Sequence, residues 1–424
     1  MEATVLETQK PGNERHIYAL DGIRAIALIM VIWFHIWEQS WLTPYTHLNP
    51  VITRYFGITE LHFHTLVQFG YTTVDMLILL SAVVNFLPYA RAIVYGEEWP
   101  DQKTFYIKRA IRILPSYLLC IVIMAIGSLI GGKYQGNVGF FFKDLITHLT
   151  FTSTFFKDTY RTTKLNGALW TIQVEVIWYI LIPFIAKWFR KRPVITTAAL
   201  YLIGIVSGNI LVCHAQDLWA YNNYFSTFAG FYASGMLICL IYYGIRKADA
   251  ENRYTMIAAT TAIFGSYLIY LNILNQFYGM ERPYAQLTKR FSFMLAMSLF
   301  TLGVLFAFPV VKRFFENRVF RFVSVISYNL YIWHQVVAVF LKEHHIPRWS
   351  TDTAPNELGD QAWMRKFFVL SIVLGVALSA AVTYLFEKPA GEYLKKKWLD
   401  ENGKAKPPKH ERKFKWNLKG KTVR

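Results

Sequence analysis

Five ionisable side chains lie inside long apolar stretches of this 424-residue chain: Arg24, His35, Asp75, Glu175 and His334. Placing a charged side chain at the centre of a bilayer costs about 2.5–3.5 kcal/mol, so such residues usually face the protein interior and serve a function. An imidazole with an unperturbed pKa of about 6.5 can exchange protons near pH 7. These residues therefore predict general acid–base chemistry inside a membrane protein.

A second group of charged residues, Lys108, Arg109 and Arg112, directly precedes an apolar stretch. Arg109 and Arg112 are three residues apart, a spacing that places both guanidinium groups on one face of a helix. Two planar guanidinium groups together suit the binding of phosphate. The alternative is that these arginines only set the membrane topology, and their spacing alone does not decide between the two.

The elements that must position these residues are ten mostly apolar stretches, each long enough to span a bilayer as a helix. Hydrophobic residues make up 54% of the chain and charged residues only 17%, compared with about 25% charged in soluble domains. We therefore predict an all-α polytopic membrane protein. The ten predicted spans are 17–38, 66–88, 113–132, 168–188, 195–213, 225–245, 255–273, 291–311, 322–341 and 366–386. A weaker stretch, 140–156, is predicted to lie at the membrane interface as an amphipathic segment.

The distribution of Lys and Arg supports this topology. Most of the 45 basic residues fall in the segments that share one side of the membrane, as the positive-inside rule requires. The prediction is a cytoplasmic segment 1–16, a membrane domain 17–386 and a basic, partly disordered cytoplasmic tail 387–424. Nucleic-acid binding is a poor explanation for the net charge of +18, because the basic residues are sorted by membrane side.

Counting residues along the predicted helices places four of the five buried ionisable groups at similar depth. His35 lies eleven residues after Arg24, or about 16 Å further outward at 1.5 Å per residue. Asp75 and Glu175 come about 13 Å and 10 Å below the outer face by the same count, and His334 also falls in the outer half. These four groups are predicted to share a pocket that opens outward.

Simpler explanations exist for each of these residues. His35 has aromatic neighbours and could belong to an interfacial aromatic belt, and His334 could be a packing residue. Glu175 could only neutralise an arginine within the helix bundle. Arg24 could form a local ion pair with Asp21, three residues earlier. The chain shows no cysteine or histidine spacing typical of a metal site, so no metal is predicted.

Five short motifs, in order along the chain, resemble those of the membrane acyltransferase-3 family. They are LDGIRAIALIMVIWFH (20–35), with Arg24 and His35; IKRAIRILP (107–115), with Arg109 and Arg112; LWTIQVEVIWYILIP (169–183), with Trp170 and Glu175; SYNLYIWH (327–334), with His334; and FEKP (386–389). In the second predicted span Asp75 and Ser81 match the family, but Ala82 replaces its usual glycine and is expected to narrow the passage beside Ser81.

The resemblance implies a plasma-membrane O-acyltransferase that uses cytosolic acyl-CoA, with acetyl-CoA as the expected donor. The implied acceptor is a hydroxyl group of an extracytoplasmic or membrane-bound glycan. His35 would be the general base, or be transiently acylated, with Asp75 or Glu175 as its orienting carboxylate. Arg109, Arg112 and Arg24 would bind the donor, and His334, Trp170 and Ser81 would contact the substrate.

A transporter or flippase for a glycolipid is the main alternative, because buried charges also line transport paths. Transporters often contain inverted repeats and helices that are broken near the middle of the membrane. This sequence shows no evident repeat, and Pro115 and Pro183 lie toward the ends of predicted spans. The sequence favours the enzyme and leaves the acceptor, the acyl chain length and the oligomeric state open.

Overall fold

The computed structural model describes residues 16–43, 45–47, 54 and 59–406. The first fifteen residues and residues 407–424, on which much of the predicted cytoplasmic segment and tail falls, lie outside the described part. Within it, ten helices are long and apolar enough to cross a membrane. Each overlaps one predicted span, and the all-α fold class is confirmed. A short hairpin, β1 (Tyr45–His47) paired antiparallel with β2 (Glu60–His62), is added to the helical fold.

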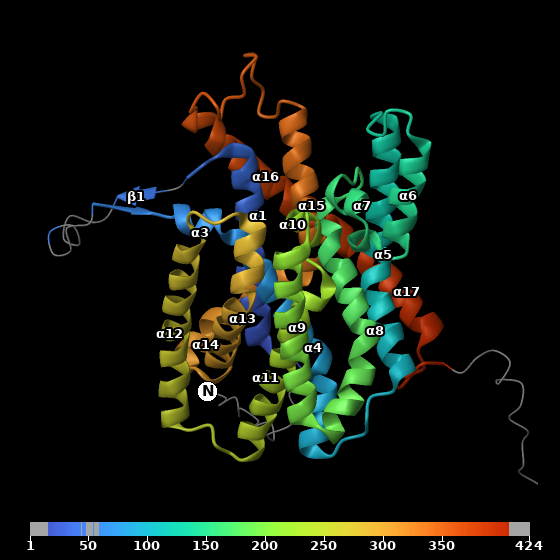
Figure 1. The fold of residues 1–424 in the computed structure, drawn as a ribbon, viewed down its shortest axis with the longest axis vertical. Coiled ribbons are helices and arrows are strands. Elements are labelled where there is room, and N and C mark those ends of the chain that lie inside the picture. The colour runs from blue at the N-terminus through green and yellow to red at the C-terminus, as the bar shows by residue number, and fades with distance from the viewer. Residues whose placement is uncertain (1–15, 44, 48–53, 55–58, 407–424) are drawn as a thin grey trace, which may run out of the picture.

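The ten candidate spans form one bundle, with the connections after α4 and α11 at its lower end in Figure 1. The spans are α1 (Tyr18–Ser40), η1 and α4 (Gly70–Thr73, Val74–Tyr95), α5 (Gln102–Ile130), η3 and α8 (Gly167–Leu169, Trp170–Lys191), α9 (Pro193–His214), η4 and α11 (Phe225–Phe228, Ala229–Lys247), α12 (Arg253–Phe277), α13 (Arg282–Phe306), α15 (Arg318–Glu343) and α16 to α17 (Gln361–Trp398). Shorter helices connect them: α3 (His64–Gln68), α6 (Val138–Leu149), η2 (Ser153–Phe155), α7 (Lys157–Arg161), α10 (Leu218–Tyr221) and α14 (Pro309–Phe315).

Two spans begin about ten residues earlier than hydropathy predicts. Helix α5 begins at Gln102, where the side chain of Asp101 accepts a hydrogen bond from the backbone N–H of Thr104 at 2.8 Å. Arg109 and Arg112 therefore lie within the helix rather than before it. Helix α13 begins at Arg282 and brings two arginines of a predicted loop into a span. Apolar windows stop at charged residues, whereas the hydrogen-bonded helix continues through them.

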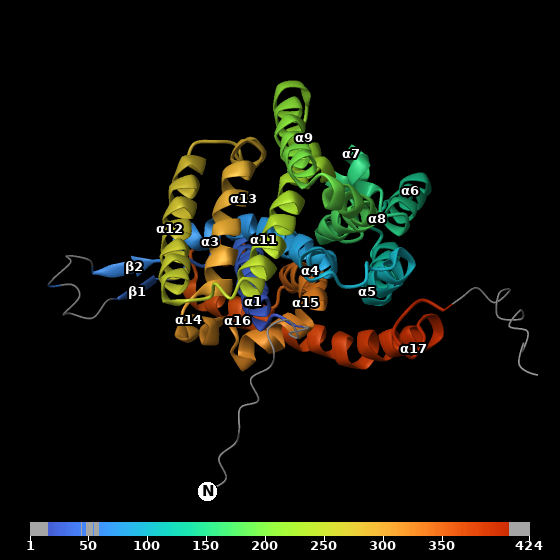
Figure 2. The ribbon, with the colours of Figure 1, turned by 90° about the horizontal axis from the view of Figure 1, so that it is seen from below.

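The last helix is also longer than predicted, since it continues to Trp398. It runs obliquely across the bundle and ends beside α5 (Figures 1 and 2). A π-helical turn, η5 (Val382–Glu387), separates α16 (Gln361–Ala381) from α17 (Lys388–Trp398). This turn ends two residues before Pro389, which lacks the N–H needed to continue the regular ladder. The first part of the predicted tail is thus helical.

The weak apolar stretch forms α6, which runs beside the outer part of α5 (Figure 1). Its amphipathic character is confirmed. The polar face of α6 is the buried face, however, and part of its apolar face is exposed. Asp144 and His148 are buried, whereas Phe142 and Ile146 are more than half exposed. The polar residues turn inward because they find hydrogen-bond partners there.

The close packing of α4 on α11 corrects one prediction about the passage beside Ser81. A Cβ atom on Gly235 of α11 would lie 2.6 Å from the Cβ of Ala82. Ala82 is buried in this contact and faces α11. The expected narrowing of the passage by Ala82 is wrong, because neighbouring helical residues point about 100° apart.

Candidate active site

A cavity of about 430 Å³ lies between α1, α4, α5, α8 and α15. It is lined by Pro88 of α4 and Arg109 of α5 near one membrane side, and by Val74 of α4 and Thr171 of α8 near the other. Fourteen residues of α4 separate Val74 from Pro88, a distance of about 21 Å in a helix. The cavity therefore extends along most of the thickness of a bilayer core.

Three guanidinium groups line this cavity: those of Arg24, Arg109 and Arg112. Within the described part of the chain, none of the three forms an ion pair with a carboxylate. The Arg109 guanidinium lies over the rings of Phe105 and Tyr179, at 5.4 and 5.7 Å, and its Nε is buried without a hydrogen-bond partner. Such unpaired donors suit an anionic ligand.

The predicted local pair between Arg24 and Asp21 is replaced by other contacts of Asp21. Its carboxylate accepts a hydrogen bond from Ser324 Oγ at 2.8 Å and lies 2.6 Å from His16 Nε2. Both neighbours lie on the inner side of the predicted topology. Arg24 is thereby left available to the cavity.

Glu175 and Ser81 also line the cavity. The hydroxyl of Tyr179 donates a hydrogen bond to Glu175 Oε2 at 2.8 Å and lies 3.4 Å from Ser81 Oγ. Asn85 donates to the Ser81 carbonyl at 2.6 Å. Glu175 lines the same cavity as the three arginines without forming an ion pair with them, and it does not contact His35. Tyr179 and Asn85 were missed because polar residues without charge do not stand out in apolar helices.

His35 lies outside this cavity and pairs with a carboxylate that was not predicted. Its Nδ1 is 2.9 Å from Oε2 of Glu38, and Arg282 Nη1 is 3.4 Å from the other carboxylate oxygen. The prediction that Asp75 or Glu175 orients His35 is therefore wrong. A signal for Glu38 was present, since residues three apart share a helical face.

His334 lies next to His35, with ring centroids 5.1 Å apart. Its Nδ1 lies 2.7 Å from the Tyr331 carbonyl oxygen and 3.2 Å from that of Leu330. Because these oxygens only accept hydrogen bonds, Nδ1 carries the proton and Nε2 presents a lone pair. That Nε2 is buried without a partner. The predicted proximity of these two histidines is present in the structure.

Asp75 does not join the histidines, which corrects the predicted four-residue pocket. It pairs with Arg290 of α13, with 3.6 Å between Oδ2 and Nε. Arg290 Nη1 also donates hydrogen bonds to the Asn222 carbonyl and to Thr227 Oγ1, at 2.6 and 2.7 Å. A count of residues along a helix gives depth but not the rotation of the helix about its axis. Val74 faces the cavity and its neighbour Asp75 faces α13.

Tyr331 borders both the cavity and the histidine pair. It lines the outer end of the cavity, and its ring centroid lies 5.7 Å from that of His334. Neither His35 nor His334 is among the described residues that line the cavity. Trp170 lies outside it too, stacked on Phe228 with ring centroids 6.2 Å apart. The single pocket predicted from the sequence is therefore two sites, the cavity with the arginines and the histidine pair, and Tyr331 lies between them.

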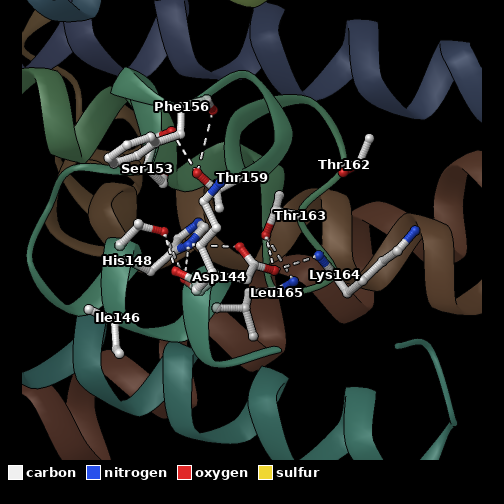
Figure 3. Close-up of polar contacts among 12 residues, drawn as sticks. Asp144, Ile146, His148, Ser153, Phe156, Thr159, Thr162, Thr163, Lys164 and Leu165 are labelled. Carbon is white, nitrogen blue, oxygen red and sulfur yellow. Dashed lines mark hydrogen bonds and ion pairs between the residues drawn. The ribbon is translucent and has the colours of Figure 1, made fainter. Parts of the chain in front are cut away.

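A buried polar cluster fixes the loop that leads into α8 (Figure 3). Asp144 Oδ2 accepts hydrogen bonds from Tyr134, Thr163 and the backbone N–H of Lys164, at 2.9 to 3.0 Å. Its Oδ1 lies 3.2 Å from His148 Nδ1. Burial raises the pKa of Asp144, but the hydrogen bonds from His148, Lys164 and Tyr134 outweigh it and hold the pKa below its usual value.

We expect Asp144→Asn to destabilise the protein by about 1–3 kcal/mol at neutral pH, because the amide offers the buried donors only one, uncharged acceptor oxygen. A carboxyl whose pKa is lowered by folding stabilises fully above its unfolded pKa of about 3.9, and this stability is lost as the pH falls through the folded pKa. The wild-type melting temperature should therefore fall more steeply below about pH 4 than that of Asp144→Asn. Thermal unfolding in detergent between pH 7 and pH 3 measures this, with the exposed Glu281→Gln as control. Parallel curves for all three proteins would contradict the assignment.

The chain was compared with known families and proteins. The family model described as an acyltransferase domain matches residues 17–388, nearly the whole chain. A protein of Acidianus two-tailed virus named "Putative acetyltransferase ORF330" is 23% identical over 242 residues, which cover 57% of this chain and 67% of the viral protein. No solved structure gives a significant match. With its many apolar helices, the chain is a multi-pass membrane protein, and it is an acyltransferase that belongs to the acyltransferase-3 family.

Proposed function

We propose that this enzyme transfers an acyl group, most simply acetyl, from cytosolic acyl-CoA to a hydroxyl of an extracytoplasmic or membrane-bound glycan at the plasma membrane. The observation that carries the proposal is the cavity with its three guanidinium groups, which extends from Arg109 to Tyr331 next to the histidine pair. An anionic nucleotide with a long neutral arm that ends in a thioester matches this layout of charge and length.

The donor would bind with its phosphates at Arg109 and Arg112, near the cytoplasmic side of the predicted topology. Arg112 is exposed, whereas Arg109 is partly buried, so the two could contact successive phosphates at the mouth. The pantetheine arm would extend along α4 toward Tyr331. Arg24, one helical turn inside the mouth on α1, would bind the donor further in, and Glu175 and Ser81 would offer hydrogen bonds to the amides of the arm.

The chemistry would take place at the histidine pair. His35 Nε2 would remove the proton of the acceptor hydroxyl while its oxygen attacks the thioester carbonyl carbon. The carbon–sulfur bond then breaks, and the CoA thiolate takes the proton from the imidazolium. Glu38 at Nδ1 would hold the His35 ring and stabilise its charged form, as the carboxylate does in hydrolase triads. His334 Nε2, which is buried without a hydrogen-bond partner, would accept a hydrogen bond from the acceptor.

Tyr331 would separate the donor cavity from the histidines until both substrates are bound. We expect Tyr331→Ala to raise hydrolysis of acyl-CoA relative to transfer, by about tenfold, because water can then reach the thioester. Tyr331→Phe keeps the ring and should behave as the wild type. Release of free CoA, measured with and without acceptor, gives the ratio. An unchanged ratio in Tyr331→Ala would contradict a barrier at this position.

The function itself can be tested with full-length protein in proteoliposomes. Isotopically labelled acetyl-CoA is supplied on the side of the Arg109 mouth, and glycans of a bacterial envelope are supplied on the other side. Mass spectrometry should then detect a labelled ester on the glycan, sensitive to mild alkali. Movement of a glycolipid across the membrane without ester formation would instead favour the flippase alternative.

A further inference from the structure

A second, largely apolar groove lies on the opposite side of α8 from the donor cavity. It has a volume of about 700 Å³ and runs between α8 and α9. Leu181, Ile185 and Trp188 of α8 and Ile195 and Ile203 of α9 contribute apolar walls. Phe225 closes the outer end, where its carbonyl accepts a hydrogen bond from Trp178 Nε1 at 3.1 Å. This hydrogen bond holds the outer end of the groove in place.

The position of α9 explains why the groove is open. Figure 2 shows α9 at the edge of the bundle, beside α8 and α11. Gly204 of α9 packs against the backbone of Gly230 in α11, where a Cβ atom would lie 3.2 Å from the Gly230 nitrogen. This close approach joins α9 to α11, and α8 and α9 meet at the sharp Arg192–Pro193 turn.

Two basic side chains lie at the end of the groove that is next to the α8–α9 turn. Lys191 and Arg192 both line it and both are exposed. Among the described residues, neither forms an ion pair with a carboxylate. Trp188, 71% exposed, lies beside them, and tryptophan favours the boundary between lipid tails and headgroups. The groove thus combines an apolar trough with a cationic end at the membrane surface.

The length of the groove matches one leaflet. Eleven residues of α9 separate Arg192 from Ile203, which is about 16 Å of helix. Half of a hydrocarbon core is about 15 Å. A single lipid could lay one acyl chain along the groove with its headgroup at Arg192. A nucleotide donor would not fit as well, because its apolar portion is short.

We propose that this groove is a specific site for an anionic phospholipid of the leaflet that contacts the α8–α9 turn. The lipid phosphate binds Lys191 and Arg192, and one acyl chain occupies the groove between Leu181 and Ile203. This site does not depend on the proposed acyl-transfer chemistry. Its bound lipid supports α8, whose other face carries Glu175 and Tyr179 into the donor cavity.

Native mass spectrometry of the full-length protein with rising phosphatidylglycerol or phosphatidylcholine of equal chain length tests the proposal. Each basic residue near an anionic lipid surface is worth about a factor of five in binding. We expect Lys191→Gln/Arg192→Gln to weaken the tightest phosphatidylglycerol site by about 25-fold. The matched control is Lys187→Gln, because Lys187 is exposed on the same helix end but does not line the groove. Ala199→Trp, which fills the groove, should remove the site with both cations intact.

Several outcomes would overturn the site. Equal affinity for both lipids, or a loss of about fivefold in Lys187→Gln, would mean that only general surface attraction is present. Retention of the site in Ala199→Trp would exclude the groove as the place of the acyl chain. Displacement by inorganic phosphate alone would identify a simple anion site, and displacement by acyl-CoA would assign the groove to the donor. Loss of catalytic activity with lipid binding intact would bear on the proposed function alone.

Discussion

Replacing His35 with glutamine is expected to lower kcat for acyl transfer by about 10²–10⁴-fold, the usual contribution of a positioned general base. The KM for acyl-CoA should change little, because His35 lies outside the cavity that contains the arginines. Glutamine keeps a polar side chain of similar reach at this partly exposed position, so the fold should persist. Initial rates with labelled acyl-CoA and acceptor measure both constants.

Glu38→Gln is the variant that separates a catalytic pair from a structural contact. Its carboxylate lies 2.9 Å from His35 Nδ1, so its loss should lower kcat less than the loss of His35 does. If the two residues act together, the double variant should be no slower than His35→Gln alone. Full activity of His35→Gln, or a change confined to KM, would remove His35 from the role of base.

The second large effect is expected at the cavity mouth. Arg109→Gln/Arg112→Gln should raise the KM for acyl-CoA by about 10²-fold or more, because a hydrogen bond to a charged group contributes about 1.5–3 kcal/mol. The decrease in kcat at saturating donor should be much smaller. Steady-state kinetics and calorimetric titration with CoA measure the two quantities independently.

Lys108 provides a matched control for this experiment. It is exposed on the same helix and carries the same charge, but it does not line the cavity. Lys108→Gln should therefore leave the CoA affinity within about twofold of the wild type, the range of a screened surface charge. Arg24→Gln, deeper on α1, should weaken acyl-CoA more than free CoA if it binds the thioester end. CoA affinity that survives in Arg109→Gln/Arg112→Gln would exclude the phosphate assignment.

Together the two predictions divide the enzyme into a donor part and a proton-transfer part. Variants of the cavity arginines should change donor binding, and variants of the histidine pair should change turnover. Tyr331 lies at the boundary and should change the partition between transfer and hydrolysis. A single shared pocket would instead predict that every variant changes both constants.

The sequence by itself determined the helical class, the ten spans and the residues worth examining. Apolar length decides whether a segment can cross a membrane, and that property is local. Burying a charged side chain in a membrane is costly, so the positions of Arg24, Glu175 and the two histidines within apolar stretches already marked them as functional candidates. A count of residues along each helix also gave His35 and His334 a similar depth.

Only the tertiary structure decided which of these residues meet. Contact depends on the rotation of each helix about its axis and on its neighbours, and a shift of one residue changes the direction by about 100°. Asp75 consequently pairs with Arg290, and Glu38 becomes the carboxylate of His35. Tyr331 separates the cavity from the histidines through packing between helices far apart in the chain. Those contacts are set by side-chain shape across helix interfaces, which no periodicity along one segment encodes.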